Sequence, residues 1–142
     1  MSGEYFVAAE LSRLGYVASV TLRNTRGIDI VATNANASRS VGIQVKTNRG
    51  KKKVWLLDQK AEGYHSKTLF YVFVNLNGPN QHPDYHVVPS VKVASFITKN
   101  HQEWLLRPNK LGAAHQDSRL RNFRDVTDEY QDRWDLLGLS EA

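Results

Sequence analysis

The sequence has 142 residues, 41% hydrophobic and 23% charged, and these values are typical of one globular domain. It contains no cysteine, which excludes disulfides and thiolate metal sites. The net charge of +5 favours a polyanionic partner. The N-terminus lacks the pattern of a signal peptide, and no apolar run approaches the ~20 residues that span a bilayer. We therefore expect a cytoplasmic protein without a membrane segment.

The first third of the chain predicts a helix followed by three strands. Apolar residues at helical spacing predict a helix from Ser2 to Leu14, which Gly15 ends. Strands are expected at Tyr16 to Leu22, Ile28 to Thr33 and Val41 to Thr47, which are rich in β-branched or apolar residues. Apolar and polar residues alternate in the third strand, so its two faces should lie in different environments.

The middle of the chain predicts further strands. Val54 to Leu57 has the composition of a short strand, and Asp58 to Tyr64 that of a helix. Leu69 to Asn75 is nearly all apolar, which predicts a central strand buried on both faces. A strand at Asp84 to Val88 and a helix from Ser90 to about Asn100 should follow.

After this helix we expect an irregular segment and a final amphipathic helix at Asp125 to Leu137. The element order is then helix, three strands, helix, two strands and C-terminal helices. This order predicts an α/β fold with a central mixed sheet flanked by helices. We expect one domain over residues 1–142, with a core at about 2–88 and a helical extension at about 89–142.

Asp29 is the most informative residue, because it is a carboxylate in an otherwise apolar strand. Such a carboxylate is costly unless it is paired, hydrogen-bonded or bound to metal. Gln44 and Lys46 lie on one face of the next strand, two residues apart. If the two strands are neighbours, the three side chains can converge at one end of the sheet. An ion pair of Asp29 with Arg23 or Arg26 is the alternative interpretation.

This grouping suits metal-assisted hydrolysis of phosphodiester bonds. Mg²⁺ prefers oxygen ligands and keeps several of its waters. Asp29 would supply the charged ligand and Gln44 its side-chain carbonyl, with a backbone carbonyl of Ile43 or Val45 as a further ligand. Lys46 would orient or help deprotonate the attacking water, or stabilise charge on the phosphate. Exposed strand residues are the alternative interpretation for Gln44 and Lys46.

Four short motifs follow one another here: Gly3-Glu4, Leu14-Gly15-Tyr16, Gly27-Ile28-Asp29-Ile30 and Gln44-Val45-Lys46-Thr47. Together they resemble the PD-(D/E)XK nuclease superfamily, in the branch of archaeal Holliday-junction resolvases and Mrr-like restriction enzymes. The resemblance implies a restriction-endonuclease-like fold and a nuclease that acts on DNA with Mg²⁺ or Mn²⁺. It implies that Asp29, Gln44 and Glu4 bind the metal and that Lys46 is catalytic. A homodimer is compatible with it, because many members are dimers.

Glu4 matches the helix glutamate of this superfamily best, since it lies in register with the apolar stripe of the first helix. Glu10 is the alternative, and a first-turn glutamate stabilised by the helix dipole is the simpler interpretation of Glu4. Gln44 departs from the usual carboxylate and removes one negative charge from the metal site. The alternative function is therefore an inactive nuclease-fold protein that binds nucleic acid or a protein partner.

Four basic residues follow the third strand in an expected loop, namely Arg49, Lys51, Lys52 and Lys53. Such a cluster can neutralise phosphates and hold DNA beside the metal. A solubilising loop is the alternative interpretation. A second basic cluster, formed by Arg119, Arg121 and Arg124, is interpreted as a set of surface salt bridges rather than a DNA contact.

Overall fold

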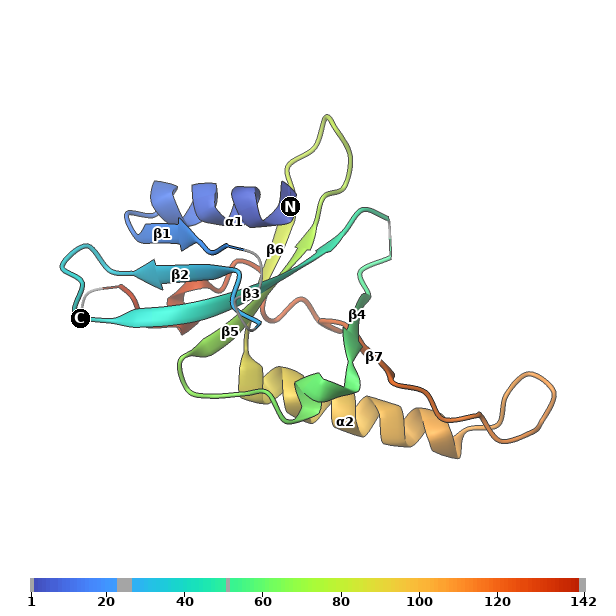
Figure 1. Ribbon diagram of the computed structural model, residues 1–142. Helices are drawn as coiled ribbons and strands as arrows, with labels where there is room; N and C mark the ends of the chain where they lie inside the picture. The colour runs from blue at the N-terminus through green and yellow to red at the C-terminus, as the bar shows by residue number, and fades with distance from the viewer. Residues whose placement is uncertain (1, 23–26, 51, 141–142) are drawn as a thin grey trace.

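The computed structural model describes residues 2–22, 27–50 and 52–140. In chain order its elements are α1 (Ser2–Arg13), β1 (Val17–Val20), β2 (Ile30–Thr33), β3 (Ser40–Asn48), β4 (Trp55–Asp58), the 3₁₀ helix η1 (Gln59–Glu62), β5 (Leu69–Asn75), β6 (Asp84–Pro89), α2 (Ser90–Leu106), β7 (Leu120–Phe123) and the 3₁₀ helix η2 (Trp134–Leu137) (Figure 1). Neither described α-helix combines the length and the apolar character that crossing a membrane requires.

Five strands form a mixed sheet in the order β1-β2-β3-β5-β6. β3 and β5 are parallel, whereas the other neighbours are antiparallel. β4 and β7 form a separate antiparallel pair. The sheet with its flanking helices confirms the predicted fold class, and β5 is buried along its whole length, as its apolar sequence predicts.

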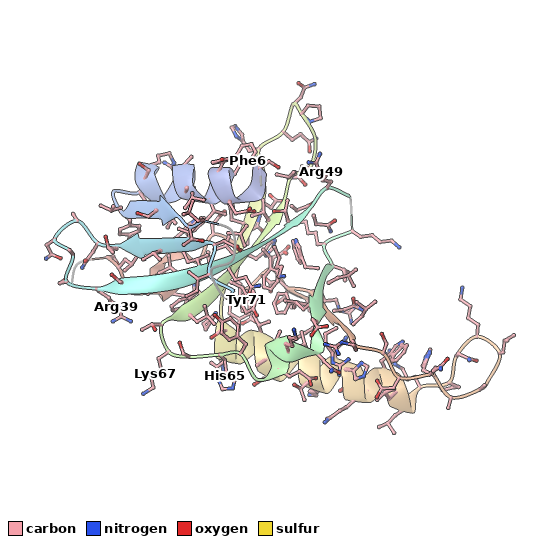
Figure 2. All side chains as sticks on the ribbon, viewed as in Figure 1. Phe6, Arg39, Arg49, His65, Lys67 and Tyr71 are labelled. Carbon is pink, nitrogen blue, oxygen red and sulfur yellow. The ribbon has the colours of Figure 1, made fainter. Side chains whose placement is uncertain are left out.

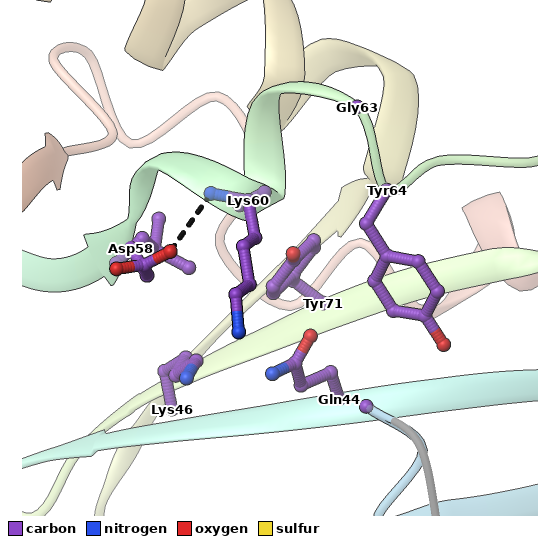
Figure 3. A pocket seen from close by; sticks show the side chains of 10 residues that line it. Gln44, Lys46, Asp58, Lys60, Gly63, Tyr64 and Tyr71 are labelled. Atoms are coloured by element: carbon purple, nitrogen blue, oxygen red, sulfur yellow. Dashed lines mark hydrogen bonds between the residues drawn. The ribbon is translucent and has the colours of Figure 1, made fainter. Parts of the chain in front are cut away.

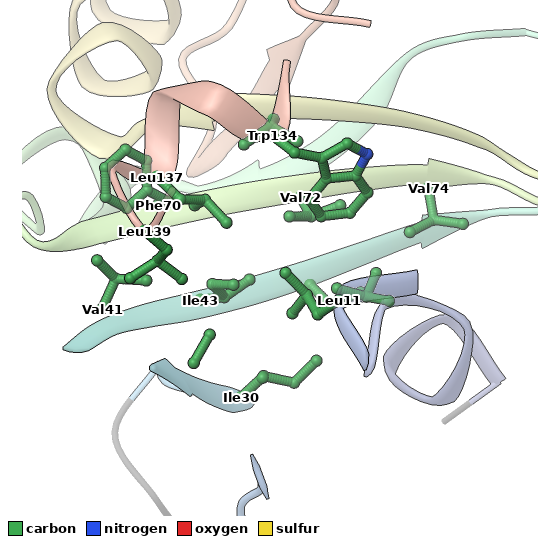
Figure 4. Close-up of a cluster of buried hydrophobic side chains, with 14 residues drawn as sticks. Leu11, Ile30, Val41, Ile43, Phe70, Val72, Val74, Trp134, Leu137 and Leu139 are labelled. Atoms are coloured by element: carbon green, nitrogen blue, oxygen red, sulfur yellow. The ribbon is translucent and has the colours of Figure 1, made fainter. Parts of the chain in front are cut away.

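One face of the sheet is covered by α1 and by the C-terminal segment. Val7 and Leu11 of α1 pack with Ile43 of β3, and Trp134 and Leu137 of η2 belong to the same apolar cluster (Figure 4). The segment after residue 89 therefore supplies part of the core under the N-terminal elements. The alternation predicted for β3 follows from this packing, because its apolar residues point into this cluster.

On the opposite face, the buried apolar cluster of the described residues lies over β5 and β6. Tyr71, in the middle of the molecule (Figure 2), and Phe73 pack there with Ile97 of α2, Trp55 of β4 and Phe123 of β7. Phe73 and Phe123 are stacked, with ring centroids 4.3 Å apart. The polar face of β3 contributes no residue to this cluster. It is therefore the part of the sheet at which functional side chains can meet solvent.

Two predicted helices are wrong. The segment from Asp58 to Tyr64 forms the end of β4 and the single turn η1, because the Asp58 carboxylate accepts the Lys60 N–H at 2.9 Å. The segment from Asp125 to Leu137 consists of turns up to η2. Its backbone reverses at Asp128 and Asp132, both with a φ of 55°.

The turns at residues 125–133 instead cover the outer edge of β6. The Tyr130 carbonyl accepts the Val87 N–H at 3.0 Å, and the Asp132 N–H bonds to the Tyr85 carbonyl at 2.9 Å. Two further differences concern the same region: α2 extends to Leu106, and β7 lies where no strand was expected. Among the described residues after 89, α2 is the one α-helix, and η2 is a single 3₁₀ turn.

Candidate active site

Asp29 directly precedes β2, at the point where β2 and β3 separate. Its N–H bonds to the Ile43 carbonyl at 2.8 Å, and its Oδ2 accepts the Val45 N–H at 2.7 Å. Val45 lies beyond the last β2–β3 pair, Ile30 with Ile43, so the Asp29 side chain takes the place of a β2 partner for its N–H. This bond compensates part of the cost of placing a carboxylate here, and it fixes the position of the Asp29 carboxylate against β3.

The electrostatics of Asp29 link it to two other predicted residues. Partial burial raises the pKa of its carboxyl, while the bond from Val45 lowers it. The negative charge of Glu4 raises this pKa further, and the positive charge of Lys46 lowers it. Both charges act on the Asp29 carboxylate, so the fold places Glu4 of α1 and Lys46 of β3 within electrostatic range of it.

Glu4 reaches this position because α1 approaches β3 closely at Gly3. A Cβ added at Gly3 would lie 1.9 Å from Oγ1 of Thr47, so only glycine fits at this contact. Glu10 lies two turns further along and forms a bidentate ion pair with Arg13, at 2.5 and 3.0 Å. Of the two glutamates considered for α1, Glu4 is the one whose charge acts on Asp29.

Gln44 and Lys46 point from β3 into a cavity of about 790 Å³ (Figure 3). Asp29 is not among the residues that line it. The remaining wall comes from the β2 approach, β4, η1 and β5, namely Gly27, Leu57, Asp58, Lys60, Ala61, Gly63, Tyr64 and Tyr71. Lys46 therefore connects two groups, the acidic pair on one side and the cavity on the other.

The donor set suits a hard divalent cation. Asp29 and Glu4 offer carboxylate oxygens, and Gln44 can offer its amide oxygen, which are the ligand types that Mg²⁺ and Mn²⁺ prefer. The two carboxylates disfavour each other's charge, and a bound cation would relieve this repulsion. The Ile43 carbonyl, considered as a further ligand, is already bonded to the Asp29 N–H.

A second group with metal-binding side chains is formed by His86, Asp125 and Asp128. Asp125 already accepts the N–H groups of Tyr130 at 2.8 Å and Glu129 at 3.1 Å, and His86 Nδ1 lies 2.9 Å from it. These bonds hold the turns that cover β6. We therefore interpret this group as a structural one.

The basic loop after β3 is only partly described. Lys51 lies outside the described residues, as do Arg23 and Arg26, the alternative partners of Asp29. Lys53 forms an ion pair with Asp84 at 3.4 Å, and Lys52 is exposed. Arg49 borders a smaller cavity of about 420 Å³ near the start of α1. DNA binding by this loop stays a prediction.

Sequence reasoning missed the residues that line the cavity opposite β3. Lys60 and Tyr64 come from η1 and the loop after it, and Tyr71 comes from β5. Burial raises the pKa of Tyr71 to about 12, so its hydroxyl stays protonated near neutral pH. Two arginines of the second basic cluster support η1, because Arg119 and Arg121 form ion pairs with Asp58 and Glu62.

No protein-family model and no curated protein matches the chain. Two solved structures share its architecture. A Holliday junction resolvase from the archaeal hyperthermophile Archaeoglobus fulgidus has a TM-score of 0.51 at 13% identity, with 100% of both chains covered. A bacterial homing endonuclease has a TM-score of 0.53 at 15% identity, covering 96% of this chain and 87% of the other. This chain therefore has the restriction-endonuclease-like fold of the PD-(D/E)XK nucleases.

Proposed function

We propose that this protein is a divalent-metal-dependent nuclease that hydrolyses phosphodiester bonds in DNA. The observation that supports it most strongly is that the opposite charges of Glu4 and Lys46 both act on the partly buried Asp29 carboxylate. A partly buried carboxylate beside a second carboxylate is unfavourable for folding alone, and it is typical of a metal site. The fold shared with two nucleases agrees with this chemistry.

Each side chain has a defined role in this proposal. Asp29 and Glu4 would hold the cation through their carboxylates, and Gln44 would contribute its amide oxygen. Bound Mg²⁺ or Mn²⁺ supplies Lewis acidity toward the phosphate and a more acidic water. Lys46 would orient the attacking water or stabilise the negative charge that develops on the phosphate oxygens. The Val45 N–H keeps the Asp29 carboxylate in place.

The test is cleavage of plasmid and branched DNA with Mg²⁺ or Mn²⁺, by wild type, Asp29→Asn and Lys46→Ala. Asparagine keeps an oxygen that can accept the Val45 N–H and removes only the charge, so the fold should persist. We expect both variants to lose at least about 100-fold in rate. Thermal unfolding and circular dichroism serve as folding controls. Unchanged cleavage by Asp29→Asn would refute the proposal.

The amide at Gln44 supports one alternative function, a nuclease-fold protein that binds nucleic acid without cutting it. With an amide at position 44, the site has two carboxylates instead of three, and the lower negative charge weakens metal binding. In that case, salt-sensitive DNA binding should persist in EDTA, and no metal should support cleavage. Binding without cleavage would favour this function over the nuclease.

A further inference from the structure

Lys60 is a second lysine of the cavity, on the wall opposite Lys46. Lys46 belongs to β3, whereas Lys60 belongs to η1. Figure 3 shows the Lys60 side chain directed from η1 toward the sheet, with its amino group on the side of Lys46 and Gln44. The mechanism proposed above uses only the β3 side of this cavity, so the position of Lys60 requires its own explanation.

η1 is fixed at both ends, which holds Lys60 at this wall. The Asp58 carboxylate accepts the Lys60 N–H at 2.9 Å, and Ala61 is buried in the core under the second sheet face. Glu62 accepts a bond at 2.9 Å from Arg121, which is itself only 7% exposed. The backbone of this single turn therefore presents Lys60 to the cavity in a defined place.

The charge balance of the cavity is positive. The lining residues with a formal charge are Lys46, Lys60 and Asp58. Arg119 compensates the charge of Asp58, because two of its nitrogens lie 3.4 and 3.5 Å from the Asp58 oxygens. Among the described residues, no carboxylate lies within ion-pair distance of either lysine, although the charge of Lys46 acts on Asp29 and that of Lys60 acts on Asp58. Two positive charges on opposite walls favour an anion between them.

The size and walls of the cavity suit a nucleotide unit of a strand. About 790 Å³ lies within the range of roughly 300–1,000 Å³ that is typical of ligand sites. Tyr64 adds a partly exposed aromatic ring to the wall, and bases stack on such side chains, whereas the buried Tyr71 only closes the wall behind it. The Tyr64 ring rests on Gly27, where an added Cβ would lie 2.4 Å from Tyr64 Cε2. This contact supports the ring at the edge of the cavity.

We propose that Lys60 is a positioning residue that binds a backbone phosphate of the substrate strand across the cavity from Lys46. The inference rests on the proposed nuclease function and adds the path of the strand, which passes between β3 and η1. Lysine binds phosphate as a point charge and releases condensed counterions when it does so. Lys60 therefore contributes to DNA binding whether or not a metal is present.

The first experiment measures binding of a labelled DNA in EDTA at several salt concentrations. The variants are Lys60→Ala, Lys60→Gln and the matched control Lys67→Ala, which removes the same charge from an exposed loop residue outside the cavity (Figure 2). We expect the two Lys60 variants to bind roughly five- to tenfold more weakly. Their slope of log affinity against log salt should be smaller by about 0.7–0.9, the value for one phosphate contact. Lys67→Ala should keep the wild-type slope.

The second experiment separates positioning from folding. In steady-state cleavage, Lys60→Ala should raise KM much more than it lowers kcat, and Lys60→Arg should restore KM, because arginine keeps the charge. Equal salt slopes for Lys60→Ala and Lys67→Ala would overturn the inference, as would a wild type that binds no DNA. A wild type that binds with the expected slope difference but never cleaves would support Lys60 and refute only the nuclease proposal.

Discussion

The contact between α1 and β3 allows a test that changes no proposed ligand. In Gly3→Ala, the new Cβ would lie 1.9 Å from Thr47 Oγ1 and 3.1 Å from Thr47 Cβ. Rotation of the Thr47 side chain moves Oγ1 but leaves its Cβ in place, so it relieves only part of the clash. If Thr47 keeps its present rotamer, the start of α1 must move outward by roughly 1–1.5 Å to regain van der Waals separation from Oγ1.

This movement carries Glu4 away from Asp29. A displacement of about 1 Å in a positioning group can lower a reaction rate about 100-fold. Overpacking should lower the free energy of unfolding by about 1–3 kcal/mol, and the better helix propensity of alanine should raise it by at most about 1 kcal/mol. We therefore expect a net loss of about 0–2 kcal/mol in stability, but a much larger loss of activity.

Single-turnover cleavage at saturating Mg²⁺ measures the loss of rate, Mn²⁺ titration measures the metal affinity, and urea unfolding measures the loss of stability. The matched control is the double variant Gly3→Ala/Thr47→Ala, which removes the clashing Oγ1 and should recover most of the lost rate. Thr47 is exposed, so Thr47→Ala alone should cost little. A folded Gly3→Ala variant with wild-type cleavage and metal affinity would refute the role of Glu4 beside Asp29.

Three other changes test the charge of the site, a buried phenol and the C-terminal packing. Gln44→Glu adds a carboxylate, so Mn²⁺ should bind about tenfold more tightly by titration calorimetry, and an unchanged Kd would contradict the ligand role of Gln44. Burial raises the pKa of Tyr71 to about 12, so the folded protein retains a proton that the unfolded chain loses above pH about 10. That stabilisation is complete below the unfolded pKa and is lost as pH rises toward 12. In urea unfolding, the free energy of unfolding of Tyr71→Phe should therefore decline less steeply at alkaline pH than that of the wild type. An equal decline in the two proteins would refute this effect of Tyr71. Trp134→Ala should lower the free energy of unfolding by about 3–5 kcal/mol, and a loss below about 1 kcal/mol would show that η2 is dispensable for the core.

The elements that the sequence predicted well are those with a strong local pattern. β5 begins and ends where its apolar run does, and the alternation in β3 assigns its two faces correctly. The placement of Gln44 and Lys46 on one face follows from that alternation alone. The proximity of Glu4 to Asp29 could be suggested from register, because Glu4 shares the helix face that packs on the sheet.

The elements that were missed depend on contacts between distant residues. β7 is a strand because it pairs with β4, about 60 residues earlier, and its own sequence has too few apolar residues to indicate one. The segment at residues 125–133 adopts turns because it bonds to the edge of β6 and because Asp125 caps its N–H groups. Lys60 could not be assigned to the cavity, since only the fold of η1 over β3 brings it there.

The packing of η2 on the N-terminal elements has a consequence for the order of folding. Every candidate ligand lies within the first 46 residues, yet the core behind them is completed by Trp134, Leu137 and Leu139. During synthesis, the ligands leave the ribosome first, and roughly 90 further residues must follow before that apolar face can close. Such distant contacts slow folding, because a long loop must close before they form.

A nascent or prematurely terminated chain would therefore carry all the candidate ligands on an incomplete core. Such a chain would expose Leu11, Ile43 and their apolar neighbours to solvent, and its acidic residues would not be held in register. This dependence links the appearance of a competent site to translation through residue 139. Arrested products that end before η2 should remain inert toward DNA.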